Sequence, residues 1–402
     1  MRILIHDYTG HPFQVQLSRQ LAKEGYEVLH VYSASFQTPK GALEKTDEDP
    51  VTFNVIGLNV GKKFHKHSYV RRYFQERKYG RLLTKEANRF LPEVVISANT
   101  PLEAQKKVLW YSKRNDIGFI YWLQDVYSVA IQKLLGKKIP IFGDLIGQYY
   151  MNLERLLLQK SNYIVAITVD FTELLKDWGI CEENIAVIPN WAPIDELPVK
   201  PKDNAWAHSH GLTDKFVFIY SGTLGLKHNP NILFQLAGRF QNYKDVRVVV
   251  ISEGRGAEWL RKRMQIQHLD NLIIMDYQDY QVLPDVLSAA DVLVAILEPE
   301  AGVFSVPSKV LTYLCFGRPL LLAVPRENLA ARIVESENAG LAAAPNEAEE
   351  FLEAAQTLFE DEEIRDAMGK NAKRYAERVF NINIIAEKFI DLIQRTGMKG
   401  TA

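Results

Sequence analysis

The stretch EPEAGVFSVPSKVLTYLCFGRP, residues 298–319, contains the most informative pattern in the chain. The apolar run 292–297 in front of it predicts a buried strand, and an apolar-periodic segment from Ser308 to Gly317 predicts a helix. A helix that begins at the carboxyl end of a strand presents free N–H groups and about half a positive charge. Lys309 adds a cation at that point, so the stretch predicts an anion site.

The rest of the chain alternates strand and helix patterns, which is typical of parallel sheets covered by helices on both faces. The periodicity fails over residues 191–212, where prolines and scattered charges replace it. The second half then opens as the first half does, with a strand, a glycine turn and a helix. The strands are predicted at residues 2–6, 27–32, 52–56, 94–97, 119–123, 163–167, 185–188, 216–220, 246–252, 272–275, 292–296 and 320–323.

This pattern indicates an α/β protein with two Rossmann-like domains facing across a cleft, and with C-terminal helices returning to the first domain. A chain of 402 residues also exceeds what one hydrophobic core usually supports. We expect a first domain over residues 1–195, a linker over 196–212, a second domain over 213–375, and a C-terminal helix within 376–402 that packs on the first domain.

Composition excludes several classes of protein. With 47% apolar residues, 24% charged residues and a net charge of −1, the chain has enough to bury and lacks the global basic excess of nucleic-acid binders. Two cysteines, Cys181 and Cys315, make neither a disulfide framework nor a zinc cluster. No window offers about 18 uninterrupted apolar residues, and the start does not match a signal sequence. We therefore expect a cytoplasmic protein with no membrane span and no nucleic-acid partner.

A basic run covers residues 62–85, where nine Lys or Arg residues and five aromatic residues accompany a single acid, Glu76. Basic residues near an anionic leaflet contribute up to about 1 kcal/mol each, and aromatic side chains suit the interface. This run predicts a peripheral patch that contacts the inner face of the plasma membrane. The alternative is a solvated helix face.

Ordered motifs along the whole chain carry a resemblance to a known family. These are GHPFQVQL at residues 10–17, YWLQD at 121–125, IPN at 188–190, YSGTLG at 220–225 and VPSKVLTYLCFGRP from residue 306. The chain resembles family 4 glycosyltransferases of the two-Rossmann (GT-B) type. Within them it is similar to bacterial enzymes of O-antigen and exopolysaccharide synthesis, such as the N-acetylfucosaminyl transferases.

The resemblance implies a retaining, hexosyltransferase-type reaction between a nucleotide-sugar donor, expected to be a UDP-sugar, and a lipid-linked saccharide acceptor in cell-surface polysaccharide synthesis. No metal and no other cofactor is expected. The leaving diphosphate needs either a divalent ion or fixed dipoles and cations, and Lys227 and Lys309 are candidates for the second role. The D-x-D spelling at residues 47–49 lies in a polar loop and is interpreted as a solvated turn.

Three features depart from the family pattern. Thr223 stands where the family often has an arginine, and the usual acidic pair falls on Phe304 and Thr312. Gln124 and Asp125 replace a His-Asp pair. The Gln124 amide suits a sugar hydroxyl, and Asp125 either orients the acceptor or caps the next helix. In retaining transfer of this type, the resemblance implies that the departing phosphate takes the acceptor's proton.

The remaining candidate site residues lie in the loops that follow the predicted strands. Glu300 is expected to approach the sugar or to be an ordinary loop charge, and the resemblance implies that Glu253 and Tyr277 lie beside the base. His11 and Asn99 are expected to contact the acceptor, although a lone loop histidine is also typical of a structural role. The donor-binding candidates are Gly10, Gly222, Thr223, Gly225, Glu253, Gly254, Tyr277, Gly302, Val303, Phe304, Ser305, Ser308 and Thr312.

Three other functions remain open. A nucleotide-sugar 2-epimerase shares the architecture but needs ionisable acid–base residues in the cleft. A nicotinamide-dependent dehydrogenase is disfavoured because the chain lacks G-x-G-x-x-G. A non-catalytic sugar-nucleotide-binding protein would fit the missing acidic pair.

Overall fold

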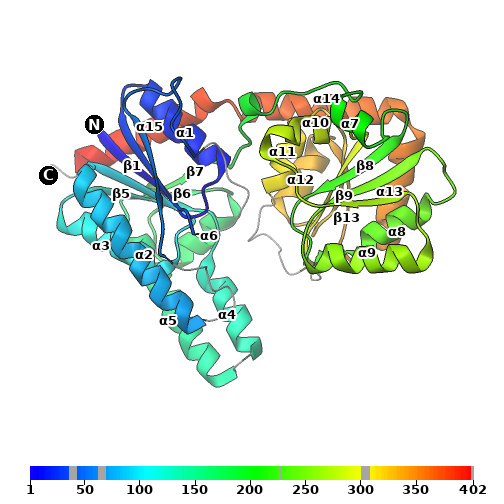
Figure 1. Cartoon of the computed structure of the whole chain (residues 1–402). Coiled ribbons are helices and arrows are strands. Elements are labelled where there is room, and N and C mark those ends of the chain that lie inside the picture. The colour runs from blue at the N-terminus through cyan, green and yellow to red at the C-terminus, as the bar shows by residue number, and fades with distance from the viewer. Residues whose placement is uncertain (36–42, 62–68, 139, 226–227, 300–307, 400–402) are drawn as a thin grey trace. The chain divides into compact units, whose positions relative to one another are not determined.

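The computed structural model describes residues 1–35, 43–61, 69–138, 140–225, 228–299 and 308–399 (Figure 1). The chain forms two compact units. Unit 1 comprises residues 1–190 together with 382–402, and unit 2 comprises residues 191–381. The chain therefore passes from unit 1 to unit 2 and returns near its end.

Unit 1 contains a parallel sheet of seven strands in the order β3-β2-β1-β4-β5-β6-β7. Strand order reverses between β1 and β4, which are hydrogen-bonded neighbours with Asp7 opposite Ala98. The carboxyl end of such a reversal is where open α/β sheets bind ligands. The strands are β1 Arg2–Asp7, β2 Glu27–Ser33, β3 Phe53–Leu58, β4 Val94–Ala98, β5 Gly118–Leu123, β6 Tyr163–Ala166 and β7 Ile185–Val187.

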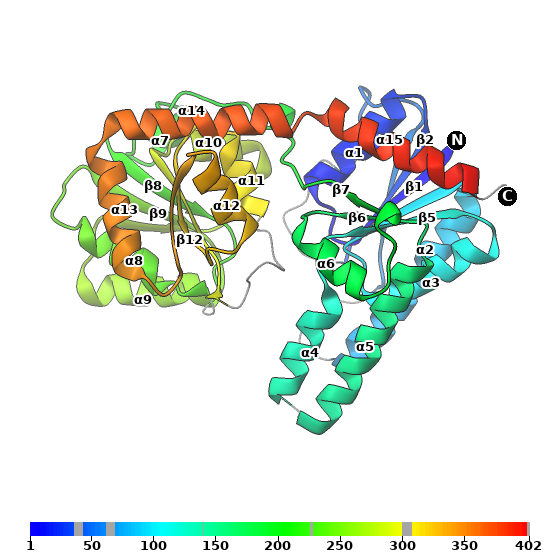
Figure 2. The ribbon, with the colours of Figure 1, turned by 180° about the vertical axis from the view of Figure 1, so that it is seen from behind.

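Helices cover both faces of this sheet. Helices α1 and α15 contact each other on one face, whereas α2 and α3 pack on the other, with α5 against α3 and α4 against α5 (Figure 2). The helices are α1 Pro12–Lys23, α2 Tyr69–Phe90, α3 Leu102–Arg114, α4 Tyr127–Lys138, α5 Pro140–Lys160, α6 Asp170–Asp177 and α15 Ile382–Lys399, with a 3₁₀ turn η1 at Glu182–Asn184.

Unit 2 repeats the architecture with six parallel strands in the order β10-β9-β8-β11-β12-β13. Its strand order reverses between β8 and β11. The strands are β8 Phe216–Ser221, β9 Val246–Ile251, β10 Leu272–Met275, β11 Val292–Ile296, β12 Leu320–Ala323 and β13 Gly340–Ala343. The helices are α7 Ala205–Ser209, α8 Asn231–Arg239, α9 Arg255–Gln267, α10 Leu283–Ser288, α11 Ser308–Leu314, α12 Leu329–Ser336, α13 Ala348–Glu360 and α14 Glu362–Val379, with 3₁₀ turns η2 Ile194–Glu196 and η4 Tyr280–Val282.

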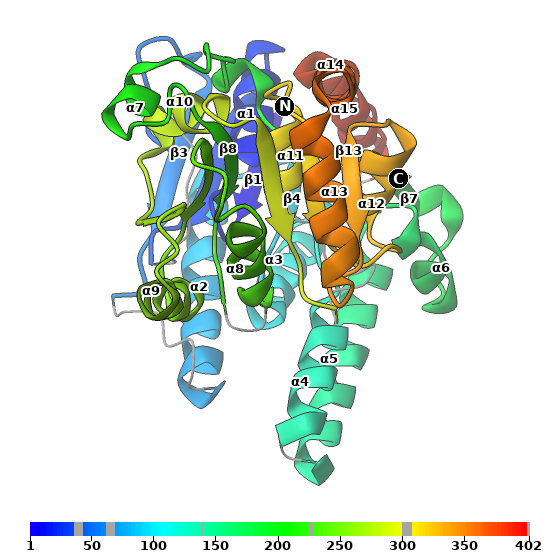
Figure 3. The same cartoon turned by 90° about the vertical axis from the view of Figure 1, so that its right-hand side faces the viewer.

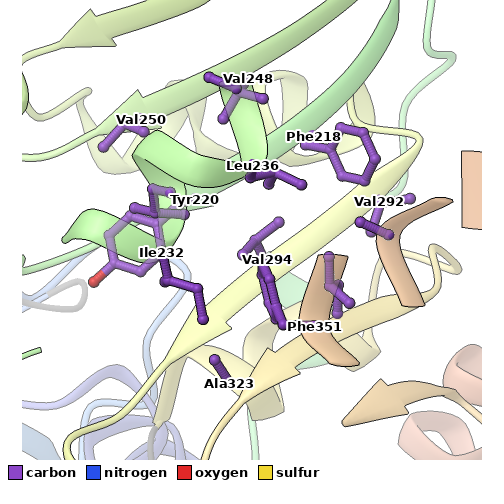
Figure 4. Close-up of a cluster of buried hydrophobic side chains, with 14 of the residues drawn as sticks. Phe218, Tyr220, Ile232, Leu236, Val248, Val250, Val292, Val294, Ala323 and Phe351 are labelled. Carbon is purple, nitrogen blue, oxygen red and sulfur yellow. The ribbon is translucent and has the colours of Figure 1, made fainter. Parts of the chain in front are cut away.

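One core of unit 2 forms on a face of its sheet where every second residue of a strand points into the same apolar cluster. Phe218, Val248 and Val294 point from neighbouring strands into one apolar cluster, and Phe351 of α13 closes it (Figure 4). All four side chains are buried. Tyr220 lies at the end of the same row, near the carboxyl edge of β8.

The structure confirms two Rossmann-like domains built on parallel sheets, and it differs from the sequence-based expectation in three details. Strand β13 is absent from the predicted list, because GLAA is short and poor in β-branched residues. Residues 196–212, expected as a linker, belong to unit 2 and contain α7. The return to unit 1 begins at Ile382 rather than at residue 376.

The D-x-D loop is an exposed turn over residues 44–48, as expected, but its last carboxylate, that of Asp49, is engaged by other residues. The Asp49 carboxylate accepts from Arg19 Nε at 2.6 Å and from the Thr46 N–H at 2.9 Å. Its side chain is 6% exposed. Asp49 therefore ties its loop to α1. In the described ranges, no helix is both long and apolar enough to cross a bilayer.

Candidate functional site

The clearest candidate for an anion site lies in unit 2, at the carboxyl edge where β8 and β11 are neighbours. The turn after β8 and the start of α11 meet there, because parallel strands end at the same edge of a sheet. Lys309, in the first turn of α11, donates from Nζ to Tyr220 Oη at 2.8 Å. The same Nζ lies 3.9 Å from the centroid of the Tyr220 ring. One contact thus joins β8 to α11.

The Lys309 amine has no opposite charge beside it among the described residues. The side chain retains some exposure to solvent, and it forms no ion pair with any described residue. Desolvation lowers the pKa of its amine from the ordinary 10.5 to about 7. A phosphate group beside Nζ would supply the missing opposite charge and raise the pKa again.

Gly222 gives access to this amine. Its φ is +139°, and a Cβ built on it would lie 2.8 Å from Lys309 Nζ. A side chain here would therefore displace the amine or block the approach to it. Gly225 follows in the same turn, where its N–H donates to His228 Nδ1 at 3.0 Å.

The predicted base-side residues also come together. Tyr277, after β10, donates from Oη to Thr223 Oγ1 at 3.1 Å, and its N–H lies 3.4 Å from Glu253 Oε1. Gly254, with φ +93°, is the N-cap of α9 and has open space around its Cβ position. Donor-binding candidates from three neighbouring strand ends therefore lie along one edge.

Other unit 2 candidates are less well placed or are not described. Ser308 is exposed at the start of α11, and Thr312 donates to the Ser308 carbonyl at 3.4 Å within the helix. Among the described residues, the Thr312 hydroxyl forms no hydrogen bond beyond its own helix. Six candidates lie outside the described residues: Lys227, Glu300, Gly302, Val303, Phe304 and Ser305.

A second polar cluster lies at the corresponding edge of unit 1, where β1 and β4 are neighbours. Asp7 is fully buried at the end of β1, and its carboxylate accepts from the Thr9 N–H at 3.0 Å and from the His11 N–H. The Gln14 amide, oriented with its nitrogen toward Asp7, donates at 2.6 and 2.8 Å. Burial alone would raise the pKa of Asp7, but the charge of His11 and the side-chain hydrogen bonds of His11 and Thr9 hold it below its usual range.

His11 is the titratable partner of Asp7. Its Nδ1 lies 3.7 Å from Asp7 Oδ1 and 2.5 Å from Thr9 Oγ1, and Asn99 Nδ2 is 3.2 Å away. Burial opposes the charged imidazole, yet Asp7 outweighs it and raises the pKa of His11 above its ordinary value. Positive φ values at Gly10 and Asn99, +80° and +50°, shape the two turns that bring the cluster together.

Asp125 and Gln124, which follow β5, differ in their hydrogen bonds. Asp125 is partly exposed, and it forms no hydrogen bond with the described residues. Burial raises the pKa of its carboxyl to about 6, although His11 acts in the opposite direction. It does not cap α4, because Glu154 accepts from the N–H groups of Tyr127 and Ser128 at 3.1 and 2.9 Å.

The Gln124 amide is engaged within unit 1. It donates to Asn190 Oδ1 at 3.0 Å and accepts from Asn190 Nδ2 at 2.6 Å. This reciprocal pair ties the end of β5 to the IPN element, so any contact with a sugar must use the remaining donor or acceptor of the amide.

Sequence reasoning assigned no role to Asp7, Gln14 or Tyr220. Asp7 is the last residue of a buried strand and precedes a glycine turn, and this position at a strand end could have indicated a ligand-binding edge. The position of Tyr220 under Lys309 has no local signal, because 89 residues separate the two. Within the described ranges, no three His, Cys, Asp or Glu residues gather as metal ligands.

Two family models match the chain. The model described as "Glycosyltransferase Family 4" matches residues 13–196, and the one described as "Glycosyl transferases group 1" matches residues 203–375. A curated relative, "Putative colanic acid biosynthesis glycosyl transferase WcaI" of Escherichia coli (strain K12), is 23% identical over 314 residues. That match covers 76% of this chain and 75% of the relative.

Solved structures show the same fold. The crystal structure of Anabaena HepE in complex with UDP and glucose superposes with a TM-score of 0.71 at 15% identity, covering 98% of this chain and 100% of that one. WaaG, a glycosyltransferase involved in lipopolysaccharide biosynthesis, superposes with a TM-score of 0.68 at 15% identity, covering 97% and 99%. With both units matched by family models and two Rossmann-like domains in the structure, the chain belongs to the family 4 glycosyltransferases of the GT-B fold.

Proposed function

We propose that the protein transfers a sugar from a UDP-sugar to a lipid-linked saccharide, with retention of anomeric configuration. The observation that carries the proposal is Lys309, an amine without a carboxylate partner among the described residues, held beside Gly222 at the β8/β11 edge. A diphosphate placed there would receive a cation and the dipole of α11. Both interactions grow stronger as the leaving group gains charge.

We assign the base of the donor to the edge formed by Thr223, Glu253 and Tyr277. Tyr277 presents an aromatic face, and Glu253 carries carboxylate acceptors suited to hydroxyl groups. The solved relative that contains UDP and glucose supports this choice of donor class. We further propose that Lys309 and Lys227 neutralise the diphosphate in place of a divalent ion.

The acceptor belongs to unit 1 in this proposal. Asp125 offers an unpaired acceptor oxygen within the described structure, and Asn99 and His11 lie at the neighbouring strand ends. We assign them to the acceptor saccharide, with Asp125 orienting the reacting hydroxyl and the departing phosphate taking its proton. Each of these groups can bond a sugar hydroxyl without a covalent intermediate.

The proposed setting is cell-surface polysaccharide synthesis at the inner face of the plasma membrane. The named relatives support it, because one is assigned to colanic acid biosynthesis and another to lipopolysaccharide biosynthesis. Basic residues of α2 supply a surface for anionic lipid. The protein would then act as a cytoplasmic enzyme bound peripherally to that membrane.

The test is transfer from radiolabelled UDP-sugars to a membrane lipid extract, with EDTA present. We expect label in the organic phase with at least one donor, and its loss in a Lys309→Met variant. Release of free sugar without labelled lipid, across the donor panel, would contradict the proposal. A requirement for added divalent ion would refute its metal-independent part alone.

The 2-epimerase alternative gains one observation from the structure. Unit 1 contains ionisable groups at its ligand edge, His11 and Asp125. The pKa of each is raised above its ordinary value, that of Asp125 to about 6. Such groups could exchange a proton on a bound sugar. Conversion of the UDP-sugar to its epimer in the absence of any acceptor would favour this function, whereas an unchanged donor would exclude it.

A further inference from the structure

Unit 1 contains a pocket that the proposed donor and acceptor residues do not line. It has a volume of about 690 Å³ and lies between α2, α3 and α5. Basic and aromatic residues make up most of its wall. From α2 these include Tyr73, Arg77 and Arg81, and from α3 they include Lys106, Lys107 and Trp110.

The charged residues that line this pocket are mostly cations. Five cations line it, with Arg114 completing the set, and none of them forms an ion pair with a described residue. Its one carboxylate, Glu103, accepts from Tyr149 Oη at 3.0 Å. The pKa of Lys107 is lowered by desolvation and by the nearby charges of Arg77 and Arg81. Cations held together in this way favour a multivalent anion such as a diphosphate.

The tertiary packing creates this cluster. Gly80 of α2 lies against α3, since a Cβ built on it would be 3.0 Å from Ala104 Cα and 2.9 Å from Lys107 Cδ. Arg77 and Arg81 are one turn apart on α2 and therefore share a face. The close crossing brings that face against the basic residues of α3.

Exposed apolar side chains lie within one helical turn of pocket residues on α2 and α5. Phe74 is 63% exposed on α2, three residues before Arg77, and Trp110 is 42% exposed in the wall itself. On α5, Leu145 and Ile146 are 67% and 44% exposed, one turn before the pocket residue Tyr149. Helices α4 and α5 project together from the sheet of unit 1 in all three views (Figure 3). A soluble anion leaves such apolar groups in water, whereas a lipid covers them.

We propose that this pocket binds the diphosphate of a membrane lipid, with Phe74, Leu145 and Ile146 contacting its hydrocarbon chain. The inference deepens the proposed function, on which it rests, by placing the lipid diphosphate of the acceptor between α2 and α3. The pocket holds the lipid and leaves the chemistry to other residues. It also accounts for why basic residues of α3, outside the basic run at residues 62–85, accompany those of α2.

Flotation of the full chain with vesicles tests this site. Phosphatidylcholine vesicles containing polyprenyl diphosphate are compared with vesicles brought to the same surface charge with phosphatidylglycerol. We expect the polyprenyl diphosphate vesicles to bind more tightly. Equal binding to both would overturn the proposal in favour of a diffuse basic surface.

Two double variants test whether vesicle binding depends on the pocket cations. Arg81→Gln with Lys107→Gln removes two pocket cations and should weaken binding to polyprenyl diphosphate vesicles about 30-fold. The control, Lys23→Gln with Lys160→Gln, makes the same charge change at exposed positions of α1 and α5, outside both the pocket and residues 62–85. It should weaken binding less than threefold. Equal losses in the two double variants would overturn the assignment. Leu145→Gln, at an exposed position that folding does not need, should also weaken binding.

The same variants separate this inference from the proposed function. If the pocket double variant still transfers sugar to lipid with an unchanged KM, the pocket assignment fails while the transferase function stands. If the wild type binds polyprenyl diphosphate through these cations but transfers no sugar, the pocket stands and the proposed function fails. Thermal unfolding of each variant confirms that the fold is intact.

Discussion

Lys309 illustrates how a residue proposed to bind an anion can lower the stability of the unliganded protein. Its amine lies against Tyr220 with no opposite charge among the described residues, and its pKa falls to about 7. Folding therefore works against the charged form that an anion would bind. Such a conflict is typical of a functional position.

The first prediction follows from this conflict. Lys309→Met should weaken UDP binding about 10- to 100-fold, because a charge-assisted hydrogen bond is lost. It should also raise the melting temperature near pH 7, because the variant no longer buries an amine. Calorimetric titration and thermal unfolding measure the two effects. Lys262→Met, at an exposed position of α9, is the matched control and should change neither.

The second prediction concerns pH. Above pH 7 the folded, unliganded protein has lost the Lys309 proton, whereas the unfolded chain keeps it up to about pH 10.5. Stability should therefore rise with pH over this interval, and UDP affinity should fall, because binding must recruit a proton. Dissociation constants measured between pH 6.5 and 9 check the trend. The same slope in Lys309→Met would disprove the assignment.

The Asp7–His11 pair supplies a third prediction. The raised pKa of His11 depends on Asp7, so Asp7→Asn should lower it. In the wild type, the pair stabilises the fold below the ordinary pKa of histidine and loses this effect as pH rises through the folded pKa of His11. NMR titration of the imidazole measures the shift. An unchanged titration in the variant would show that Asp7 does not hold the charge.

Among the elements, β13 shows how packing overrides a weak local pattern. Its four residues have little strand propensity, yet they pair with β12 along their whole length, from Leu320–Gly340 to Ala323–Ala343. Gly340 permits this approach, since a Cβ there would lie 2.0 Å from the Leu320 carbonyl oxygen. Neighbouring backbone, rather than a flexible side chain, would meet the added methyl group.

A fourth prediction follows. Gly340→Ala should destabilise unit 2 by about 3 kcal/mol, because the backbone of β12 must move. Gly238→Ala in α8 is the matched control, because its Cβ would meet nothing within 4 Å. That variant should be neutral or gain up to about 1 kcal/mol from helix propensity. Urea unfolding compares the two, and equal stabilities would refute the packing explanation.

On the scale of the whole molecule, α15 belongs to unit 1, although the rest of that unit ends at residue 190. It follows α14 of unit 2 directly, but it packs on α1, β4 and β5 of unit 1. Phe389 is fully buried there, with its ring centroid 4.8 Å from that of Trp122. The C-terminal helix therefore completes the core of the first half of the chain.

The fifth prediction tests this connection. Phe389→Ala should destabilise unit 1 by about 3–5 kcal/mol through the cavity it leaves. Calorimetry with and without UDP identifies the unit 2 transition as the one that the ligand raises. We expect the variant to lower the other transition, and Lys388→Ala, exposed on the same helix, to lower neither. A drop confined to the UDP-linked transition would contradict the assignment of α15.

The sequence alone predicted two α/β halves, because short continuous apolar runs indicate strands buried on both faces, and a period of 3.6 residues indicates helices buried on one face. It also located the start of α11 at Ser308, beside Lys309, since helix-start signals are local. It missed the contact of Lys309 with Tyr220, the α2–α3 pocket and the pairing of Gln124 with Asn190. Each of these joins side chains that the order of strands or the crossing of helices brings together. Only the tertiary structure decided them, because no local period encodes which distant segments become neighbours.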